Sequence, residues 1–282
     1  MHDHIPSKTA LRVAMRRAVH QLLDEPKVLD DPFALPILGE ETAAELRASP
    51  GGFERIGTGS LRAFVAARSR FAEDQLASAV EQGVRQCVVL GAGLDTFAYR
   101  NPFADLRVIE VDHPATQAWK RDLLASAGIA IPHSMSFVAV DFAKQNLAEE
   151  LNRAEFSNTE PTFFSWLGVV PYLTRAAAFD TLRWIASLPP ESEVVFDYAI
   201  SRSQLGFLER TALDALSNRV ARAGEPFQLF FEPAELQMAL AGMGFHQIDD
   251  LDAAEMNARY FADRRVGLKI RGNLGHLISA RV

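Results

Sequence analysis

The chain has 282 residues, 48% of them hydrophobic and 23% charged, which is enough to build one large domain around a hydrophobic core. Its formal net charge is −7, from 29 Lys and Arg against 36 Asp and Glu, so it has no general attraction for phosphate backbones and we expect no nucleic-acid partner. Residues 1–24 carry charges throughout, and no apolar run reaches the roughly 18 residues of a membrane span, so we expect neither a signal peptide nor a membrane partner, and a cytoplasmic protein.

The first 84 residues are expected to form a helical cap. Apolar residues repeat with helical spacing over residues 8–24, which predicts an amphipathic helix. A second helix is expected over 30–38, because a proline stands at its first turn. A long helix is predicted over 60–82, and Arg68 lies among the apolar positions of its inner stripe. A charge on such a face needs a partner, and a core carboxylate and a ligand are equally open.

From residue 85 strands alternate with helices, which predicts a parallel sheet. Residues 87–90 form a continuous apolar run, typical of a strand buried on both faces. Gly91 and Gly93 follow, where the first can turn the chain and the second lets a ligand approach the backbone. Thr96 occupies the third position of the G-x-G-x-x-G pattern, which disfavours a standard dinucleotide site.

The next two predicted strands both end in an acid. Strand 106–112 ends at Asp112, and Asp141 follows strand 137–140. A carboxylate after the glycine turn is the usual acceptor for ribose hydroxyls, and the second could accept from the adenine amine. The alternative is that both acids cap helices. Two acids at successive strand ends make an adenosine site the better interpretation.

The remaining elements complete the sheet. Further strands are expected at 162–167, 193–198, 245–251 and 276–282, and further helices at 113–127, 145–153, 174–188 and 233–243. Residues 201–231 are interpreted as a lid above the strand ends. This divides the chain into a cap (1–84), a core (85–200), a lid insertion (201–231) and a C-terminal part of the core (232–282).

Several short stretches together resemble the leucine carboxyl methyltransferase family, in particular its bacterial S-adenosylmethionine-dependent O-methyltransferases of the polyketide type. They are residues 91–96, 99–100, 110–114 and 140–142, supported by 30–33, 67–71 and 196–198. The likeness spans roughly residues 10 to 280. It implies an α/β class I methyltransferase fold, Rossmann-like, with a seven-stranded sheet and a helical cap, in a protein of secondary metabolism.

The resemblance also implies S-adenosylmethionine as the cofactor. By this likeness Asp112 holds the ribose, Arg68 holds the cofactor carboxylate, and the two glycines face the methionine part. Glu110 is the alternative to Asp112, or else pairs internally. The implied cofactor set is Arg68, Gly91, Gly93, Asp112, Asp141 and Phe142. No metal site is expected.

One departure concerns Leu167, which stands where the family has a glutamate near the cofactor. Phe97 is likewise apolar where the bacterial branch commonly has arginine. These changes imply altered cofactor affinity, an unusual substrate, or a member that binds the cofactor without catalysis. A nicotinamide oxidoreductase is a third hypothesis, which Thr96 disfavours.

The leading hypothesis is methyl transfer to an oxygen of a small molecule. A carboxylate is ionised at neutral pH and needs no base, and Tyr198 and Arg202 are the candidates to hold it. A phenol or alcohol would need a base, for which His113 and His246 are the candidates.

Overall fold

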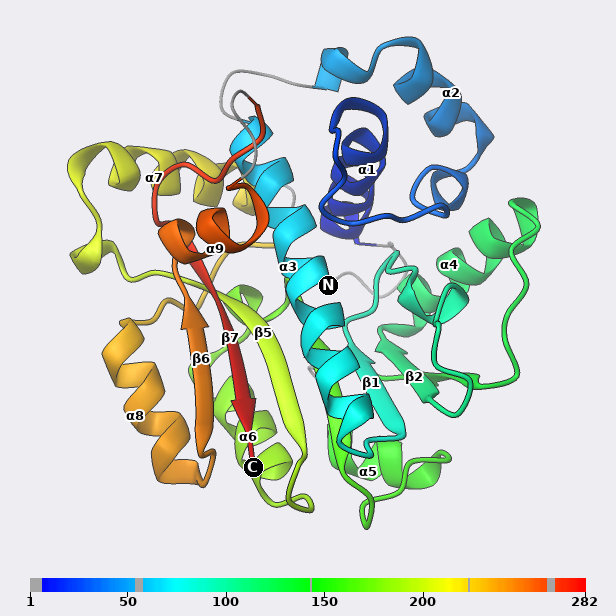
Figure 1. The fold of residues 1–282 in the computed structure, drawn as a ribbon, viewed down its shortest axis with the longest axis vertical. Helices are drawn as coiled ribbons and strands as arrows, with labels where there is room; N and C mark the ends of the chain where they lie inside the picture. Colours follow the sequence, from blue (N-terminus) through cyan, green and yellow to red (C-terminus); the bar gives the residue numbers. More distant parts are fainter. Residues whose placement is uncertain (1–6, 54–57, 143, 223, 263–266) are drawn as a thin grey trace.

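The computed structural model describes residues 7–53, 58–142, 144–222, 224–262 and 267–282. These residues form one seven-stranded sheet in the order β3-β2-β1-β4-β5-β7-β6 (Figure 1). The strands are β1 (Gln86–Leu90), β2 (Arg107–Asp112), β3 (Met135–Ala139), β4 (Thr162–Trp166), β5 (Glu193–Ala199), β6 (Gln247–Leu251) and β7 (Gly275–Arg281). The first five are parallel, and β7 runs antiparallel to both β5 and β6. The expected seven-stranded α/β fold is confirmed.

β1 lies inside the sheet, between β2 and β4, and all five of its residues are buried. Successive side chains of a strand point to opposite faces, so Cys87 and Val89 join one hydrophobic cluster while Val88 and Leu90 join the other. Two apolar layers explain why the sequence shows a continuous apolar run here instead of an alternating one.

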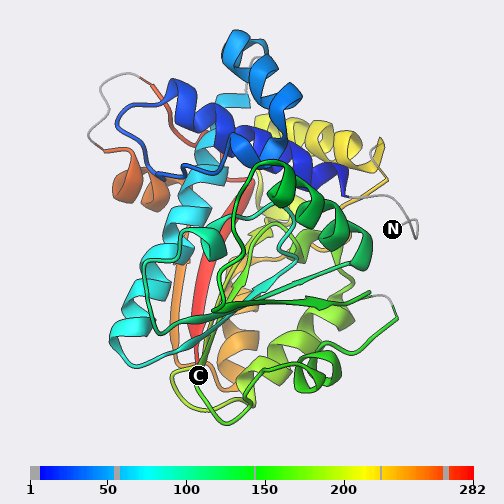
Figure 2. The ribbon, with the colours of Figure 1, turned by 90° about the vertical axis from the view of Figure 1, so that its right-hand side faces the viewer.

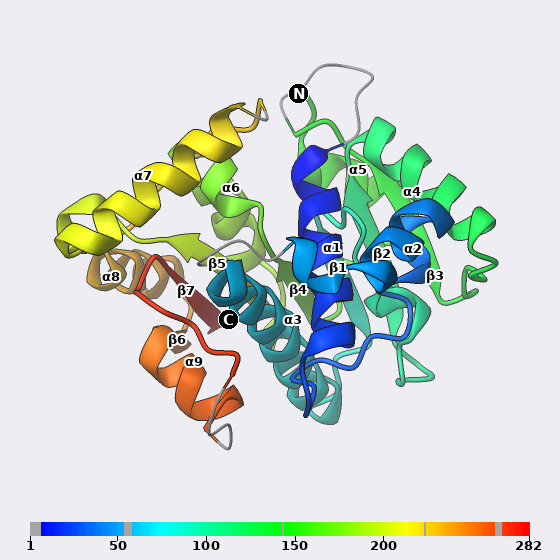
Figure 3. The ribbon, with the colours of Figure 1, turned by 90° about the horizontal axis from the view of Figure 1, so that it is seen from above.

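Helices cover both faces of the sheet. α3 (Thr58–Glu81), α4 (Pro114–Ser126) and α9 (Ala253–Tyr260) contribute to the first cluster, and α5 (Leu147–Arg153), α6 (Arg175–Ala186) and α8 (Pro233–Met243) to the second. α1 (Lys8–Leu23) and α7 (Phe207–Arg222) lie above the edge of the sheet where the parallel strands end (Figures 2 and 3). None of the described helices is long and apolar enough to cross a membrane.

The predictions from the sequence differ from the structure for three helical elements. The helix expected over 30–38 is only a short 3-10 turn at Pro36–Leu38, because the Asp31 side chain accepts the Phe33 N–H and forms a turn. α2 (Glu40–Ala48) and α9 were not predicted. For α9 a signal existed, since Asp252 and Glu255 form a reciprocal capping box at its start.

α1 is joined to the loop after β1 by a buried arginine. Arg17 donates to the Leu94 carbonyl at 2.6 Å, and its guanidinium lies 3.4 Å from Asp31 and 3.6 Å from Asp95. The Thr96 hydroxyl donates to Asp31 at 2.7 Å. Burial alone would raise the pKa of Asp95, but Arg17 and the other cations around it lower the pKa below its ordinary value. The amino-terminal helix and the loop therefore form one packed unit.

We predict that Arg17→Met lowers the free energy of unfolding by about 3–5 kcal/mol, because it leaves Asp31 and Asp95 without a cation they depend on. Urea unfolding measures this difference. Arg12→Met, at an exposed position of the same helix, is the control and should change stability by no more than about 0.5 kcal/mol. Equal effects of the two substitutions would show that the Arg17 contacts do not hold the helix in place.

Candidate functional site

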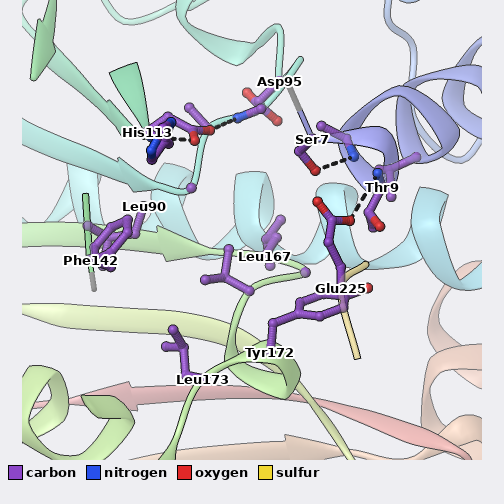
Figure 4. Close-up of a pocket in the computed structure, with 18 of the residues that line it drawn as sticks. Ser7, Thr9, Leu90, Asp95, His113, Phe142, Leu167, Tyr172, Leu173 and Glu225 are labelled. Carbon is purple, nitrogen blue, oxygen red and sulfur yellow. Dashed lines mark hydrogen bonds between the residues drawn. The ribbon is translucent and has the colours of Figure 1, made fainter. Parts of the chain in front are cut away.

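A cavity of approximately 600 Å³ lies where the parallel strands end, beneath α1 and the segment 224–228 (Figure 4). Its walls come from the ends of β1, β2, β3 and β4, from α1, and from the turn before α6. This volume is in the range of pockets that enclose a small organic ligand. The expected cofactor residues Arg68, Gly91, Gly93, Asp112, Asp141 and Phe142 all line it.

The glycine turn after β1 has left-handed backbone at both glycines. Gly91 has φ of +65° and Gly93 of +48°, a region that other residues adopt at a cost. A side chain at Gly91 would overlap Val169, and a Cβ at Gly93 would lie 3.0 Å from the Cβ of Ala10. The space beside both glycines is thus taken by the protein's own residues. Close approach of a ligand to Gly93 stays a prediction.

Asp112 connects this turn to the end of β2. Its carboxylate accepts the Gly93 N–H at 2.5 Å and the His113 N–H at 2.6 Å. Burial raises the pKa of Asp112 more than these two N–H groups lower it. The residue that caps α4 is His113, whose Nδ1 accepts the Ala115 N–H, so the capping alternative for Asp112 is wrong. Each carboxylate oxygen keeps a lone pair for a ligand hydroxyl.

Asp141 follows the end of β3 on the same side of the cavity. Its Oδ2 lies 3.2 Å from Lys144 Nζ and 3.9 Å from His113 Nε2. α5 is capped by Asn146, so the capping alternative is also wrong for Asp141. Phe142 lies beside this end of the cavity, close to Leu90 (Figure 4). An aromatic wall next to two acids suits a flat, polar-edged group.

Arg68 is buried and its Nη1 lies 3.1 Å from Asp197 Oδ2. The other Asp197 oxygen accepts the Gly168 N–H at 2.5 Å. Gly168 has φ of +72°, and a Cβ there would lie 2.8 Å from Arg68 Nη2. A core carboxylate is therefore present as the partner of Arg68, but a guanidinium has five N–H donors and can also bind a ligand carboxylate.

Tyr198 and Arg202 do not line the cavity. Tyr198 follows Asp197 on β5, so it points to the opposite face, where it is 1% exposed and donates to Asp250 at 2.7 Å. Arg202 is exposed and pairs with Asp214 at 3.1 Å. The structure therefore does not bring either residue to a substrate in this cavity.

Among the remaining candidates, Glu110 pairs with Lys120 at 2.6 Å and accepts from the Tyr99 hydroxyl at 3.2 Å. Of the two roles considered for Glu110, internal pairing is therefore the one observed. Leu167 lines the cavity with its apolar side chain. Of the two histidines, His113 lines the cavity, whereas His246 is exposed and outside it.

Sequence reasoning missed one group of lining residues. Thr9 at the start of α1 donates its N–H to Glu225 Oε2 at 3.2 Å, across 216 residues of sequence. Tyr172, in the turn before α6, lies beside them (Figure 4). Burial raises the pKa of Tyr172 to about 12, so its hydroxyl stays protonated at neutral pH. No motif marks these residues, because the fold alone brings their segments together.

The strand order, the glycine turn after β1 and the acids after β2 and β3 together define a class I methyltransferase fold. Two solved structures share it over most of their length. A putative methyltransferase from Thermobifida fusca has a TM-score of 0.58 and 17% identity, covering 95% of this chain and 93% of that one. A DUF574 family protein from Streptomyces avermitilis has a TM-score of 0.56 and 18% identity, covering 94% and 96%.

Sequence comparison gives the family. The model of the leucine carboxyl methyltransferase family matches residues 10–186. A Bacillus subtilis relative described as "Putative S-adenosyl-L-methionine-dependent methyltransferase YktD" is 32% identical over 291 residues, covering 95% of each chain. A relative from Saccharopolyspora erythraea is 32% identical over 200 residues, covering 70% of this chain and 69% of its own. The chain belongs to the leucine carboxyl methyltransferase family.

We predict that Gly91→Ala destabilises the protein by about 1–3 kcal/mol, because alanine at φ of +65° is strained and its methyl group overlaps Val169. Adding Val169→Ala should recover part of the loss by removing the overlap and leaving the strain. Gly242→Ala is the control, since Gly242 lies in α8 with open space around it. This substitution should raise the free energy of unfolding by up to about 1 kcal/mol. A Gly91→Ala variant as stable as the wild type would contradict the packing described for the turn.

Proposed function

We propose that this chain transfers the methyl group of S-adenosylmethionine to an oxygen of a small molecule. The use of S-adenosylmethionine follows from membership of the family and from the names of the relatives. The oxygen acceptor is the finer part of the proposal. The observation that best supports binding of the cofactor concerns Asp112. This residue lines the cavity, fixes the glycine turn by one hydrogen bond, and keeps lone pairs for a ribose.

The described lining residues fit both parts of the cofactor. Asp112, Asp141 and the backbone of Phe142 would hold the adenosine part, and the glycine turn with Arg68 the methionine part. A guanidinium binds a carboxylate through two parallel N–H groups, which suits the amino-acid end. When bound, the cofactor supplies a methyl group on a positively charged sulfur that is already an activated leaving group.

The rest of the reaction is positioning and exclusion of water. α1 and segment 224–228 cover the cavity, and the Thr9–Glu225 hydrogen bond joins them. Aligning two reactants within such a cavity contributes several kcal/mol to a transfer whose methyl donor needs no further activation. The role of this chain is therefore to hold the acceptor oxygen in line with the methyl group.

Two classes of acceptor are compatible with this geometry. A carboxylate, which the family resemblance implies, is ionised at neutral pH and needs no base. A hydroxyl needs a group to take its proton, and His113 and Glu225 are lining residues that could do so. An ester product is cleaved by alkali and a methyl ether is not, so alkali treatment of the product separates the two classes.

Leu167 raises a second candidate function, a protein that binds the cofactor without catalysis, but its chemistry favours the enzyme. A carboxylate near the sulfonium attracts the bound cofactor, but this attraction is lost as the sulfur becomes neutral in the transition state. The lack of that charge at Leu167 is therefore expected to weaken binding more than it slows transfer.

We predict that Asp112→Ala weakens binding of S-adenosylhomocysteine by about 1.5–3 kcal/mol, the value of a hydrogen bond to a charged acceptor. Isothermal titration calorimetry measures the affinity, and circular dichroism establishes that the variant is folded. Asp122→Ala, at an exposed position of α4, should bind as the wild type does. Unchanged affinity of a folded Asp112→Ala variant would remove Asp112 from the site.

We predict that Leu167→Glu tightens S-adenosylmethionine binding and leaves S-adenosylhomocysteine binding nearly unchanged, because only the first ligand carries the sulfonium charge. The new acid must find a donor such as Ser69 of the same cavity wall, since an unpaired buried acid is costly. Leu167→Gln is the matched control, with the same shape and no charge. Calorimetry that finds no binding to the wild type or to either variant would contradict the proposed function as a whole.

A further inference from the structure

The cavity has a second end, away from the acids after β2 and β3. Figure 4 shows His113 and Phe142 on one side of the cavity and Glu225, Tyr172 and Thr9 on the other. This second end is formed by α1, by the turn before α6 and by segment 224–228. If the adenosine part binds at the first end and the methionine part at the glycine turn and Arg68, the second end is left for the methyl acceptor, so this inference rests on the proposed function.

Glu225 places a carboxylate at this second end. It is half-buried, and its Oε2 accepts the Thr9 N–H at 3.2 Å. A carboxylate has about four positions for incoming hydrogen bonds, so one N–H leaves capacity for a ligand. Tyr172 and Thr9 add hydroxyl groups, and Leu167 and Leu173 add apolar surface.

The arginines among the described lining residues are already paired with carboxylates. Among the described lining residues the arginines are Arg17, which pairs with Asp31 and Asp95, and Arg68, which pairs with Asp197. The proposed function further directs Arg68 to the cofactor carboxylate. A second carboxylate brought beside Glu225 would therefore meet a like charge, and such juxtaposition costs several kcal/mol.

We infer that the methyl acceptor is an uncharged hydroxyl on an apolar body, and that Glu225 is the base that takes its proton. As the acceptor oxygen forms its bond to the methyl carbon, the sulfur–carbon bond breaks and its electron pair stays on sulfur. The hydroxyl proton passes to the Glu225 carboxylate and from there to solvent when the product leaves. The product is a methyl ether, which replaces the ester implied by the family resemblance.

The apolar walls match such an acceptor. The side chains of Leu167 and Leu173 face the cavity between its two ends, beside the ring of Tyr172 (Figure 4). The ring centroids of Tyr172 and Phe227 lie 5.1 Å apart, and this packing holds the Tyr172 ring in the cavity wall. A flat aromatic alcohol has the apolar body and the single donor that this end can accommodate.

The test compares two probes that share a ring system, β-naphthol and β-naphthoate, binding to the complex with S-adenosylhomocysteine. We expect the wild-type complex to bind β-naphthol at least about tenfold more tightly than β-naphthoate, because of the charge of Glu225. Glu225→Gln should strengthen β-naphthoate binding and remove this preference. Glu235→Gln, at an exposed position of α8, removes the same charge elsewhere and should keep the preference.

Activity gives a second readout for the same variants. With S-adenosylmethionine the wild type should form the methyl ether of β-naphthol, and Glu225→Gln should lower the rate at least about a hundredfold, the usual contribution of a general base. The affinity of the variant for both forms of the cofactor should match the wild type. Thermal unfolding in parallel shows that the variant keeps its fold.

Three results would overturn the inference. The first is tighter binding of β-naphthoate than of β-naphthol by the wild type, or binding of neither. The second is loss of S-adenosylmethionine affinity in Glu225→Gln with S-adenosylhomocysteine affinity kept, which would place Glu225 at the sulfonium. The third is a wild type that forms no ether. Failure of the proposed function is distinct, because then the cofactor itself would not bind.

Discussion

The carboxylate of Asp112 holds the site together. It accepts N–H groups from Gly93, in the turn after β1, and from His113, at the start of α4. Two segments whose backbone amides would otherwise face the cavity unpaired are thereby fixed at neighbouring strand ends. The same carboxylate keeps the acceptor capacity that a ribose requires. In the proposed function one side chain thus serves both the fold and the ligand. Its position at the end of β2, beside the turn after β1, is the starting point for the remaining geometry.

The amino-terminal helix depends on the same turn from its other side. Arg17 donates to the Leu94 carbonyl and lies between Asp31 and Asp95, and Ala10 occupies the space beside Gly93. Buried charges are costly unless they are paired, so a helix placed elsewhere would leave this cluster uncompensated. Because α1 also carries Thr9, which binds Glu225 across the cavity, the packing that fixes the turn also determines how the cavity is covered.

The sheet and the lining residues at the ends of β1, β2 and β3 could be predicted because their signals are local. An apolar run, a glycine pair and acids at strand ends are properties of adjacent residues, and parallel strands bring their ends together without further information. The other end of the cavity, which we propose for the acceptor, has no such signal, since Thr9, Tyr172 and Glu225 come from three distant segments. The prediction for Tyr198 is wrong because side chains alternate along β5. Asp197 points to the face of the sheet where Arg68 lies, so the next residue, Tyr198, points into the hydrophobic cluster on the opposite face. Arg68 was recognised as needing a partner, but its partner lies 129 residues away and only the fold identifies it.

We propose that S-adenosylmethionine binds in one cavity, bounded by the glycine turn, Asp112, Asp141 and α1. Hydrogen–deuterium exchange with and without S-adenosylhomocysteine tests it most directly, because it reports on every segment of the unaltered chain. We expect slower exchange on ligand addition at residues 89–95, 112–113 and 140–142 and at the start of α1, with β6 and α9 unchanged. Protection confined to other segments, with these four unaffected while the ligand binds, would contradict it.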